Sequence, residues 1–439
     1  MVFSIDSGTT NSKVFLFDND GRLVRMASQP TPTFYPQAGW VEQPAEGWWQ
    51  AVVQATKNLG IGPKKKRLSG LSLSSQGGTF VLLDREMKPL RPAITWLDNR
   101  ARAIAACLNR QYGQDFFYQK TGHVLRGWAP LALLLWLKRV EQETWKHIHR
   151  VSFVSDYLNF KLTGRFYLDH TSAQMSCLYN LRTGTWDEEL LQLTGLKPEQ
   201  LPEILPADAI GGETRPPECH QLDLPAGLPG VAGGHDQYCA CLGTGAGKKG
   251  DILLSCGTAW ALLLTTDRLI FDNEHLFCPG RHILKGKYGL MGVVSEAGAL
   301  LAWIRENMKI NLAASLSEKI EKKIAGLRVK LGFTQGKGAI SNLSLSVTGQ
   351  EIYVKVLQTL IGEVCWLLKH MEEKTKINRI YLAGGGTKEP LLPNYLEEFT
   401  GKKVVVPEVK EAAGRGAAFL VSRTFREKAG RKNEKLGRD

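Results

Sequence analysis

The chain begins with a carboxylate and several hydroxyl-bearing residues around a tight turn, in the stretch FSIDSGTTNSKVFLF (residues 3–17). A phosphate is bound well by backbone N–H groups in such a turn, because no bulky side chain blocks its approach. The candidate phosphate-binding residues are Gly8, Thr9, Thr10, Asn11 and Ser12. Lys13 either adds positive charge to this site or points to solvent. A plain hairpin with polar turn residues is the alternative interpretation.

Asp6 precedes this turn, and its carboxylate would repel a bound phosphate unless a cation lay between them. We therefore expect Asp6 to contact magnesium, directly or through water. The common phosphate loop GxxxxGK[ST] is absent, since GAGKKG at residues 245–250 has the wrong spacing. A nucleotide would have to be held in another way.

Three later stretches resemble parts of a ligand site. The strand, Gly-Thr turn and strand at residues 253–264 repeat the plan of residues 5–17, which suggests two related domains that face one another. A turn of three glycines, Gly384, Gly385 and Gly386, would let the backbone lie flat against a planar or phosphorylated ligand. Asp236 follows GGH, where a simple turn with a satisfied carboxylate is the alternative to a functional role.

Strands that alternate with helices must position these residues, which indicates an α/β fold. We expect an N-terminal antiparallel meander, a helix behind Pro44, a buried strand that ends at SSQGG, and helices at residues 130–140 and 155–162. The proline-rich stretch at 196–229 is the candidate linker between two domains.

The composition is that of an ordinary globular protein, with 439 residues, 43% hydrophobic and 23% charged. The longest apolar runs fall short of the roughly 20 residues that cross a bilayer. The N-terminus lacks the features of a signal peptide, so we expect a cytoplasmic protein without a membrane partner. The eight cysteines form neither a disulfide framework nor a zinc pattern.

The net charge of +13 is partly concentrated at residues 64–67 and after residue 426. Both stretches lack interleaved aromatic residues, so we interpret them as a solvated loop and a frayed terminus and expect no nucleic-acid partner.

Six stretches occur in the order found in the FGGY carbohydrate kinase family: DSGTTNSK, WLDNR, SDYLNFKLTG, GGHDQ, SCGTAW and AGGGTKEPLL…EAAGRGAA. The resemblance covers residues 2–421. It implies two ribonuclease-H-like domains of the actin and sugar-kinase superfamily, which close around a central cleft on ATP, Mg²⁺ and a sugar or polyol. The expected divisions are residues 1–231, residues 232–425 and a basic tail at 426–439.

The resemblance also assigns roles to residues. It implies that Asp236 is the catalytic base and, with Asp6, a metal contact. The turn up to Lys13 and the pair Gly257 and Thr258 would bind phosphate, and the three-glycine turn would bind adenosine. The acceptor would be held by Gln76, Gly77, Trp96, Asp98, Arg100, Asp236 and Gln237. Alternatively, Trp96 lies in the core and Asp98 and Arg100 form a surface ion pair.

Members of this family phosphorylate glycerol, ketoses and aldonates, and SSQGG is closer to the ketose and gluconate versions, so we expect a ketose such as xylulose. The C-terminal domain is trimmed: a lysine-rich helix and GLRVKLGFTQGKGAISNLSLS replace a longer insert. A homodimer is the prior expectation for the family. A sugar or nucleotide sensor without turnover and an actin-like ATPase are the alternatives to a kinase.

Overall fold

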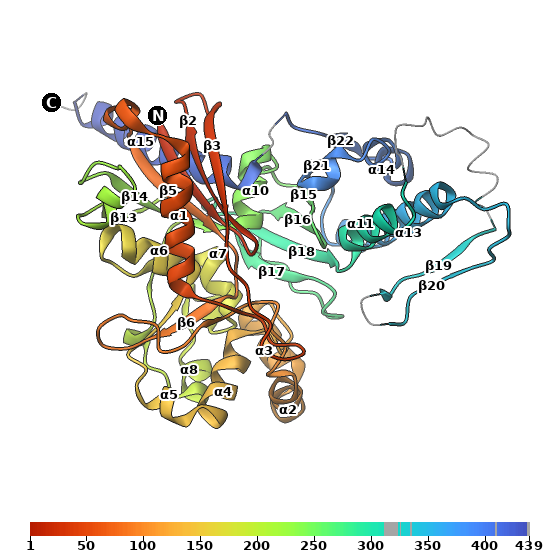
Figure 1. The fold of residues 1–439 in the computed structure, drawn as a ribbon, viewed down its shortest axis with the longest axis horizontal. Coiled ribbons are helices and arrows are strands. Elements are labelled where there is room, and N and C mark those ends of the chain that lie inside the picture. Colours follow the sequence, from red (N-terminus) through yellow and green to blue (C-terminus); the bar gives the residue numbers. More distant parts are fainter. Residues whose placement is uncertain (311–323, 325, 334–335, 409–410, 437–439) are drawn as a thin grey trace. The chain divides into compact units, whose positions relative to one another are not determined.

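The computed structural model of the chain describes residues 1–310, 324, 326–333, 336–408 and 411–436. The chain forms two compact units (Figure 1). The first contains residues 1–243, 271–288 and 411–439, and the second contains residues 244–270 and 289–410. The predicted division into residues 1–231, 232–425 and 426–439 stays a prediction.

A mixed sheet lies at the centre of the first unit, with strands in the order β13-β14-β5-β1-β2-β3. β1, β2 and β3 are antiparallel neighbours, which confirms the predicted meander. β5 runs parallel to β1, and β14 runs parallel to β5. The strands are β1 (Val2–Ser7), β2 (Asn11–Phe17), β3 (Leu23–Pro30), β5 (Gly70–Ser75), β13 (Ile210–Glu213) and β14 (Pro229–His235).

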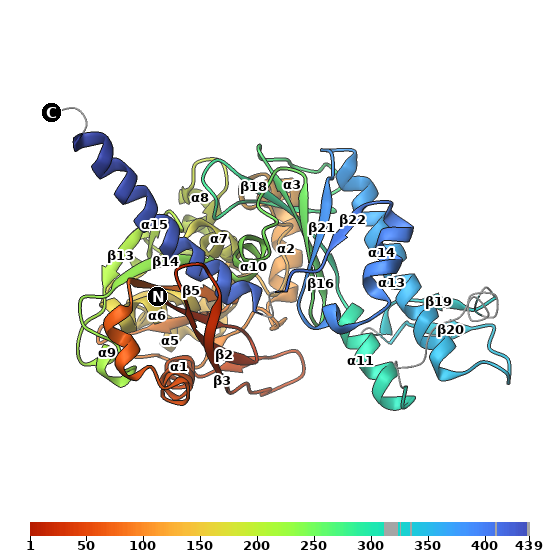
Figure 2. The same ribbon diagram turned by 90° about the horizontal axis from the view of Figure 1, so that it is seen from above.

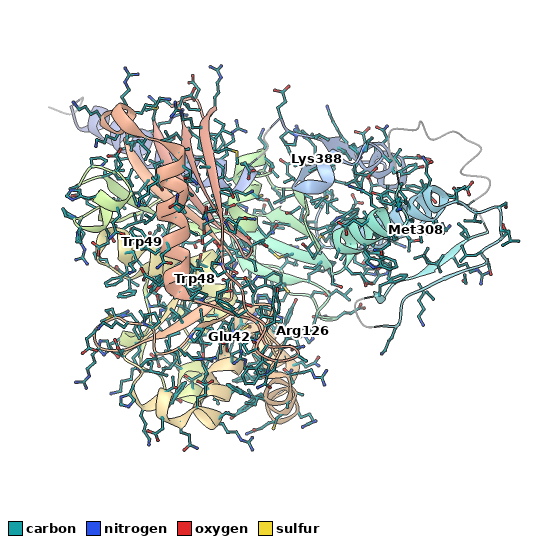
Figure 3. All side chains as sticks on the ribbon, in the orientation of Figure 1. Glu42, Trp48, Trp49, Arg126, Met308 and Lys388 are labelled. Carbon is teal, nitrogen blue, oxygen red and sulfur yellow. The ribbon has the colours of Figure 1, made fainter. Side chains whose placement is uncertain are left out.

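Helices cover both faces of this sheet because side chains alternate between the faces along each strand. On one face, Phe3 and Ile5 share a core with Trp48 of α1 (Ala45–Leu59; Figure 3) and with α6 (Val154–Thr163). On the other face, the Phe15 ring packs against Gly414 of α15 (Ala412–Leu436), where a Cβ atom would come within 2.4 Å of the ring. Figure 2 shows α15 passing across β5 and β1, which it contacts.

The predicted helices of the first unit are confirmed. α1 follows Pro44 and ends at Gly60, whose left-handed backbone (φ 63°) suits glycine. α4 (Pro130–Val140) and α6 match the predicted spans at residues 130–140 and 155–162. α15 also includes residues 426–436 of the predicted basic tail, and a short 3-10 helix (Gly62–Arg67) replaces the loop expected at residues 64–67.

The interpretation of residues 196–229 as a linker is wrong. β12 (Glu203–Leu205) pairs with β9 (Tyr167–Asp169), and β13 pairs with β14 inside the central sheet. The segment therefore belongs to the first unit.

A second sheet of the first unit has the order β4-β7-β6-β8, and the loop with WLDNR follows β7. These strands are β4 (Glu42–Gln43), β6 (Phe80–Leu83), β7 (Ala93–Ile94) and β8 (Arg150–Phe153). The remaining elements of this unit include α2 (Arg102–Tyr112), α3 (Gln114–Thr121), α5 (Gln142–Lys146), α7 (His170–Ala173), β10 (Tyr179–Asn180), β11 (Thr185–Trp186), α8 (Glu188–Thr194), α9 (Glu218–Gln221), α10 (Asp236–Thr244) and β17 (Cys278–Arg281).

The second unit repeats the plan of the first. β15 pairs antiparallel with β16 and parallel with β21, as β1 pairs with β2 and β5, which confirms the repeat predicted from the two Gly-Thr hairpins. The elements are β15 (Asp251–Cys256), β16 (Trp260–Thr266), β18 (Tyr288–Val294), α11 (Ala297–Asn307), β19 (Arg328–Lys330), β20 (Ala339–Ser341), α13 (Gly349–Glu372), β21 (Arg379–Ala383), α14 (Leu392–Thr400) and β22 (Lys403–Val405).

The sequence predicts a lysine-rich helix before residue 324 and no segment long and apolar enough to cross a bilayer. The lysine-rich helix predicted before residue 324 lies largely in 311–323, outside the described residues. Within the part of the chain that the structure describes, no helix has the length and apolar character needed to cross a bilayer.

Candidate active site

The candidate site of the first unit lies where three neighbouring parallel strands end. Ser7 of β1, Ser75 of β5 and His235 of β14 are register partners across these strands. Because the carboxyl ends of parallel strands meet at one edge of a sheet, Asp6 and Asp236 come close together. Asp6 and Asp236 are far apart in the sequence, and the order of the strands in the sheet brings them together.

The Asp6 carboxylate is held by its neighbour on β5, since the Ser74 hydroxyl donates a hydrogen bond of 2.8 Å to Asp6 Oδ1. Desolvation, together with the nearby charge of Asp236, raises the pKa of Asp6 to about 7. Desolvation also raises the pKa of Asp236 to about 6, although the Gln237 backbone N–H donates to its carboxylate. The carboxylates of Asp6 and Asp236 thus lie near one another, and both are partly desolvated.

This pair fits a magnesium ion. Mg²⁺ is usually bound by one or two carboxylates together with water and substrate phosphates, so it needs no larger cage of protein ligands. After desolvation, the nearby charge of Asp236 contributes most to the raised pKa of Asp6, and a divalent cation would relieve this repulsion. Among the described residues, no cluster of three or more His, Cys, Asp or Glu side chains could hold a metal ion instead.

The predicted phosphate turn connects β1 to β2. The Gly8 N–H donates to the Asn11 carbonyl oxygen at 3.0 Å and closes the turn, while the Thr10 side chain is exposed at its tip. The Ser12 hydroxyl is buried between the hydroxyls of Ser7 (3.2 Å) and Thr31 (3.3 Å), so it supports the turn from below.

Lys13 does not simply point to solvent. Its Nζ atom lies 2.7 Å from Glu411 Oε2, just before α15 begins. The only lysine of the predicted phosphate turn is therefore paired with a carboxylate.

The SSQGG turn after β5 is tied to the phosphate turn. Gln76 is buried, and its Oε1 accepts hydrogen bonds from the hydroxyls of Thr9 and Thr79, both at 3.1 Å. Its Nε2 donates to Gln43 Oε1 at 3.1 Å. Gly77 lies against His235, because a Cβ atom at residue 77 would be 2.6 Å from His235 Cδ2. Gln76 thus fixes the turn with all its side-chain polar atoms.

Trp96 lies beside this turn and is 40% exposed, so the alternative that it belongs to the core is wrong. Its Nε1–H donates to Thr9 Oγ1 at 2.8 Å. A Cβ atom at Gly78 would lie 3.3 Å from Trp96 Cβ and 3.6 Å from the Trp128 ring, so both tryptophan side chains contact the glycine turn. An exposed aromatic face beside hydrogen-bonding groups suits a sugar or polyol.

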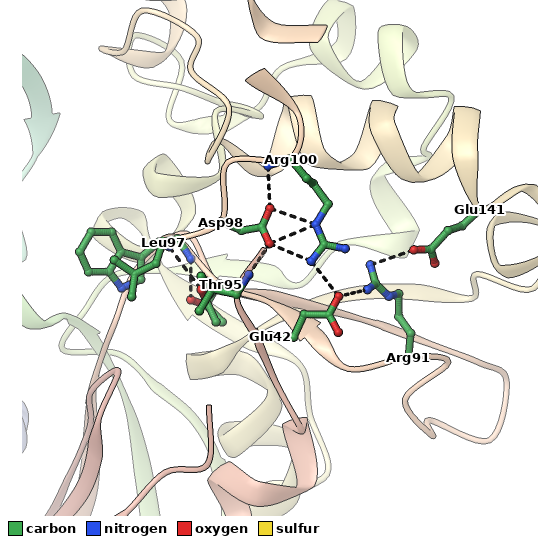
Figure 4. A network of polar contacts seen from close by, with 10 residues as sticks. Glu42, Arg91, Thr95, Leu97, Asp98, Arg100 and Glu141 are labelled. Atoms are coloured by element: carbon green, nitrogen blue, oxygen red, sulfur yellow. Dashed lines mark hydrogen bonds and ion pairs between the residues drawn. The ribbon is translucent and has the colours of Figure 1, made fainter. Parts of the chain in front are cut away.

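Asp98 and Arg100 form a buried network and not a surface ion pair (Figure 4). Both side chains have no exposed surface, and Arg100 donates to Asp98 and to Glu42, the latter at 2.7 Å. Asp98 Oδ2 also accepts from the Val41 N–H at 2.7 Å, and Arg91 pairs with Glu42. This network supports the loop that presents Trp96, and its hydrogen-bonding groups are turned away from solvent.

Gln237 directly follows Asp236, and Arg126 carries a positive charge near His123. Gln237 Oε1 is buried and has no hydrogen-bond partner among the described residues, so it offers an acceptor to a ligand hydroxyl. Arg126, labelled in Figure 3, is exposed. Burial, followed by the neighbouring charges of His235 and Arg126, lowers the pKa of His123 to about 4.

The predicted nucleotide residues of the second unit come together. Gly257 and Thr258 are exposed between β15 and β16. A Cβ atom at Gly386 would lie 2.4 Å from Cys256 Cβ, so the three-glycine turn packs directly beside this hairpin.

The three glycines of this turn differ in what requires them. Gly384 adopts a left-handed backbone (φ 85°) that favours glycine. Gly385 is exposed and begins a 3-10 helix (Gly385–Lys388). A Cβ atom at Gly385 would meet the Cys256 carbonyl oxygen at 3.9 Å, an ordinary contact, so the packing of the turn requires glycine at 384 and 386 but not at 385. The adenosine contact that the family resemblance implies for Gly384, Gly385 and Gly386 stays a prediction.

Sequence reasoning missed several supporting residues. Ser74, which donates to Asp6, and Glu411, which pairs with Lys13, carry no signal of their own, since single polar residues in strands and loops are common. A groove of about 630 Å³ elsewhere in the first unit, lined in part by Arg150, Trp186 and Glu203, includes none of the predicted site residues.

Comparison with known proteins gives a consistent result. Residues 1–243 match the N-terminal domain of the FGGY family of carbohydrate kinases, and residues 333–425 match its C-terminal domain. The glycerol kinase of Thermococcus kodakarensis is 26% identical over 439 residues, which cover 95% of this chain and 87% of that protein. The gluconokinase of Bacillus subtilis is 27% identical and covers 95% and 86%.

Solved structures show the same architecture. Ligand-bound xylulose kinase from Lactobacillus acidophilus has a TM-score of 0.86 at 23% identity, covering 97% of this chain and 90% of that chain. Glycerol kinase from Plasmodium falciparum with ADP has a TM-score of 0.86 at 21% identity, covering 97% and 89%. These likenesses confirm the predicted α/β fold of two ribonuclease-H-like domains.

Proposed function

The chain belongs to the FGGY family of carbohydrate kinases, and from this membership we propose that it transfers the γ-phosphoryl group of MgATP to a hydroxyl of a small sugar or polyol. The observation that carries the proposal is the pair of half-buried carboxylates, Asp6 and Asp236, at the ends of the parallel strands β1 and β14, which flank β5. One carboxylate suits a metal ion, and the other suits a proton acceptor.

Asp236 is the proposed catalytic base. A sugar hydroxyl is a poor nucleophile until a carboxylate orients it and accepts its proton. The hydroxyl oxygen then bonds to the γ-phosphorus, its proton passes to Asp236, and the bond from that phosphorus to the departing ADP oxygen breaks. A carboxylate that burial has made more basic than usual is suited to this task.

The proposed phosphate contacts are the turn of residues 8–13 in the first unit and Gly257 with Thr258 in the second. The turn of Gly384, Gly385 and Gly386, packed beside Cys256, is the proposed adenosine contact. Asp6 and Asp236 would hold Mg²⁺, which when bound neutralises charge on the phosphates. Lys13 would exchange its partner Glu411 for a phosphate oxygen.

The proposed acceptor contacts are Trp96 and Gln237, which offer an exposed indole face and an unpaired carbonyl oxygen. Gln76 and Gly77 shape the turn beside them, and Asp98 and Arg100 fix the loop from behind. We propose a ketose such as xylulose as the acceptor. The SSQGG stretch supports this choice, because it is closer to the ketose and gluconate versions of the family than to the glycerol-binding version.

The test is ADP release with MgATP and a panel of polyols, ketoses, aldoses and aldonates. An acceptor should stimulate the wild type and not Asp236→Asn, while Asp20→Asn, which changes an exposed carboxylate, should behave as the wild type. ADP release without any acceptor would favour an actin-like ATPase. Nucleotide binding without turnover would favour a sensor.

A further inference from the structure

His235, the residue before the proposed base, is anchored through its backbone. Its N–H donates to Thr171 Oγ1 at 2.9 Å, and that hydroxyl in turn donates to Asp169 Oδ2 at 2.6 Å. Asp169 also caps α7 by accepting from the N–H groups of Thr171 and Ser172. The end of β14 is therefore fixed by a buried chain of hydrogen bonds.

The imidazole ring of His235 is fixed as well. It occupies the space that Gly77 leaves open, since a Cβ atom there would lie 2.6 Å from Cδ2 and 2.9 Å from Nε2. On another side the ring packs edge-on against Tyr238, with centroids 6.1 Å apart. In this orientation Nε2 lies 3.3 Å from Asp236 Oδ1.

The hydrogen bonding of the ring indicates its tautomer. Nδ1 is buried and has no hydrogen-bond partner among the described residues. A proton on Nδ1 would be a buried donor without an acceptor, whereas a bare Nδ1 is only an unused acceptor, which costs less. A neutral ring with its proton on Nε2 therefore fits the site, and Nε2 is the ring nitrogen that lies 3.3 Å from Asp236 Oδ1.

We propose that His235 is a positioning residue that donates from Nε2 to Asp236 Oδ1 and holds the base in its working rotamer. Gly77 is part of this arrangement, because a Cβ atom at residue 77 would crowd the ring and, equally closely, Met175 Cγ at 2.6 Å. The second oxygen of Asp236 is then left to face the acceptor hydroxyl. This inference rests on the proposed function and concerns the same site.

The experiment compares His235→Leu, His235→Gln and Gly77→Ala by steady-state kinetics with MgATP and the acceptor found in the panel. Leucine fills a similar volume without a donor, and the amide nitrogen of glutamine reproduces the donor at the Nε2 position. We expect His235→Leu and Gly77→Ala to lower kcat by roughly 10- to 100-fold with both KM values nearly unchanged, because a misplaced base slows the chemical step. His235→Gln should recover most of kcat.

His282→Leu is the matched control. His282 is also buried and packs edge-on against Tyr238, at 5.2 Å, but no contact joins it to Asp236 among those described. Its kcat should equal that of the wild type within about threefold. An equal loss in both leucine variants, or no rescue by glutamine, would show a general packing effect and overturn the inference.

A second readout does not depend on turnover. Nitrogen-15 NMR of histidine-labelled protein, with the His235 signal identified by its loss in His235→Gln, should show a neutral ring protonated at Nε2. A ring protonated at Nδ1 would contradict the proposal. If no acceptor supports turnover, the proposed function fails; if Asp236→Asn is inactive and His235→Leu is normal, only the positioning role fails.

Discussion

Trp96 and Thr9 connect the two halves of the candidate site in the first unit, through a hydrogen bond of 2.8 Å from the indole Nε1 to Thr9 Oγ1. The same hydroxyl donates to Gln76 Oε1 at 3.1 Å. The Thr9 side chain therefore fixes both the exposed indole of Trp96 and the Gln76 side chain in the SSQGG turn. The proposed phosphate and acceptor contacts are linked through this side chain.

Because Thr9 bonds both side chains, we expect the effects of mutations at Trp96 and Thr9 on kcat/KM to be non-additive. Trp96→Phe keeps an aromatic ring but removes the donor, and we expect kcat/KM for the acceptor to fall roughly tenfold, the value of about one hydrogen bond. Thr9→Val should have a larger effect, because it also releases Gln76. The double variant should be little worse than Thr9→Val alone. Fully additive losses in this double-mutant cycle would contradict the link.

The proposed role of Asp6 as a Mg²⁺ ligand predicts how the activity of an Asp6 variant depends on Mg²⁺. Asp6→Asn keeps the shape and the hydrogen bond from Ser74 but removes the charge. We expect a loss of about 100-fold or more in kcat that additional Mg²⁺ recovers only in part. Ser74→Ala, which leaves the carboxylate in place, should have a much smaller effect. An unchanged magnesium titration of Asp6→Asn would argue against the assignment, as would full activity of the wild type in EDTA.

The network around Arg100 predicts a stability effect. Arg100→Met would leave Asp98 and Glu42 as buried carboxylates without this partner, a change that typically costs about 3–5 kcal/mol. Lys146→Met breaks an exposed pair with Glu143 and should cost less than about 1 kcal/mol. Denaturant unfolding of the two variants checks this difference. Similar midpoints would show that the buried network contributes little.

Much of the fold could be predicted because its signals are local. The helix behind Pro44 and the two Gly-Thr hairpins are specified by apolar spacing and by turn residues, and the structure confirms them. The proline-rich stretch misled because prolines mark turns whether a segment links two domains or connects short strands within one. Only the pairing of β12 with β9 and of β13 with β14 distinguishes these cases.

The sequence indicated which residues belong to the candidate site better than it indicated what each residue does there. Asp6 and Asp236 stand out from the sequence, but their proximity follows from strand order, which no short stretch encodes. Asp98 and Arg100 looked like ligand contacts or a surface pair, because their partner Glu42 is far away in sequence. Their burial could be recognised only from the tertiary structure.

The three-glycine turn predicts a nucleotide-binding defect. Gly386→Ala would place a Cβ atom 2.4 Å from Cys256 Cβ, so the turn must move away from the Gly257 hairpin. We expect ATP affinity, measured by calorimetry, to fall by tenfold or more, since about 1.4 kcal/mol suffices for that change. Gly362→Ala in α13 meets no atom within 4 Å and is the matched control. Equal affinities for both variants would remove this turn from the nucleotide site.

The lowered pKa of His123 predicts that the free energy of unfolding depends on pH. Burial, followed by the charges of His235 and Arg126, lowers its pKa from 6.5 to about 4. The unfolded chain therefore binds more protons between these values, so the contribution of the neutral ring is complete above pH 6.5 and is lost as the pH falls toward 4. The raised pKa values of Asp6 and Asp236 act in the opposite direction. A variant must therefore be compared with the wild type at each pH.

The comparison uses His123→Gln, which removes the titrating group. Between about pH 7.5 and about pH 4.5 the wild type should lose on the order of 2 kcal/mol more unfolding free energy than this variant, seen as a difference in Tm. His220→Gln, which changes an exposed ring, should follow the wild type across the same range. If His123→Gln and the wild type lose stability in parallel, the buried ring is not the acid-sensitive group.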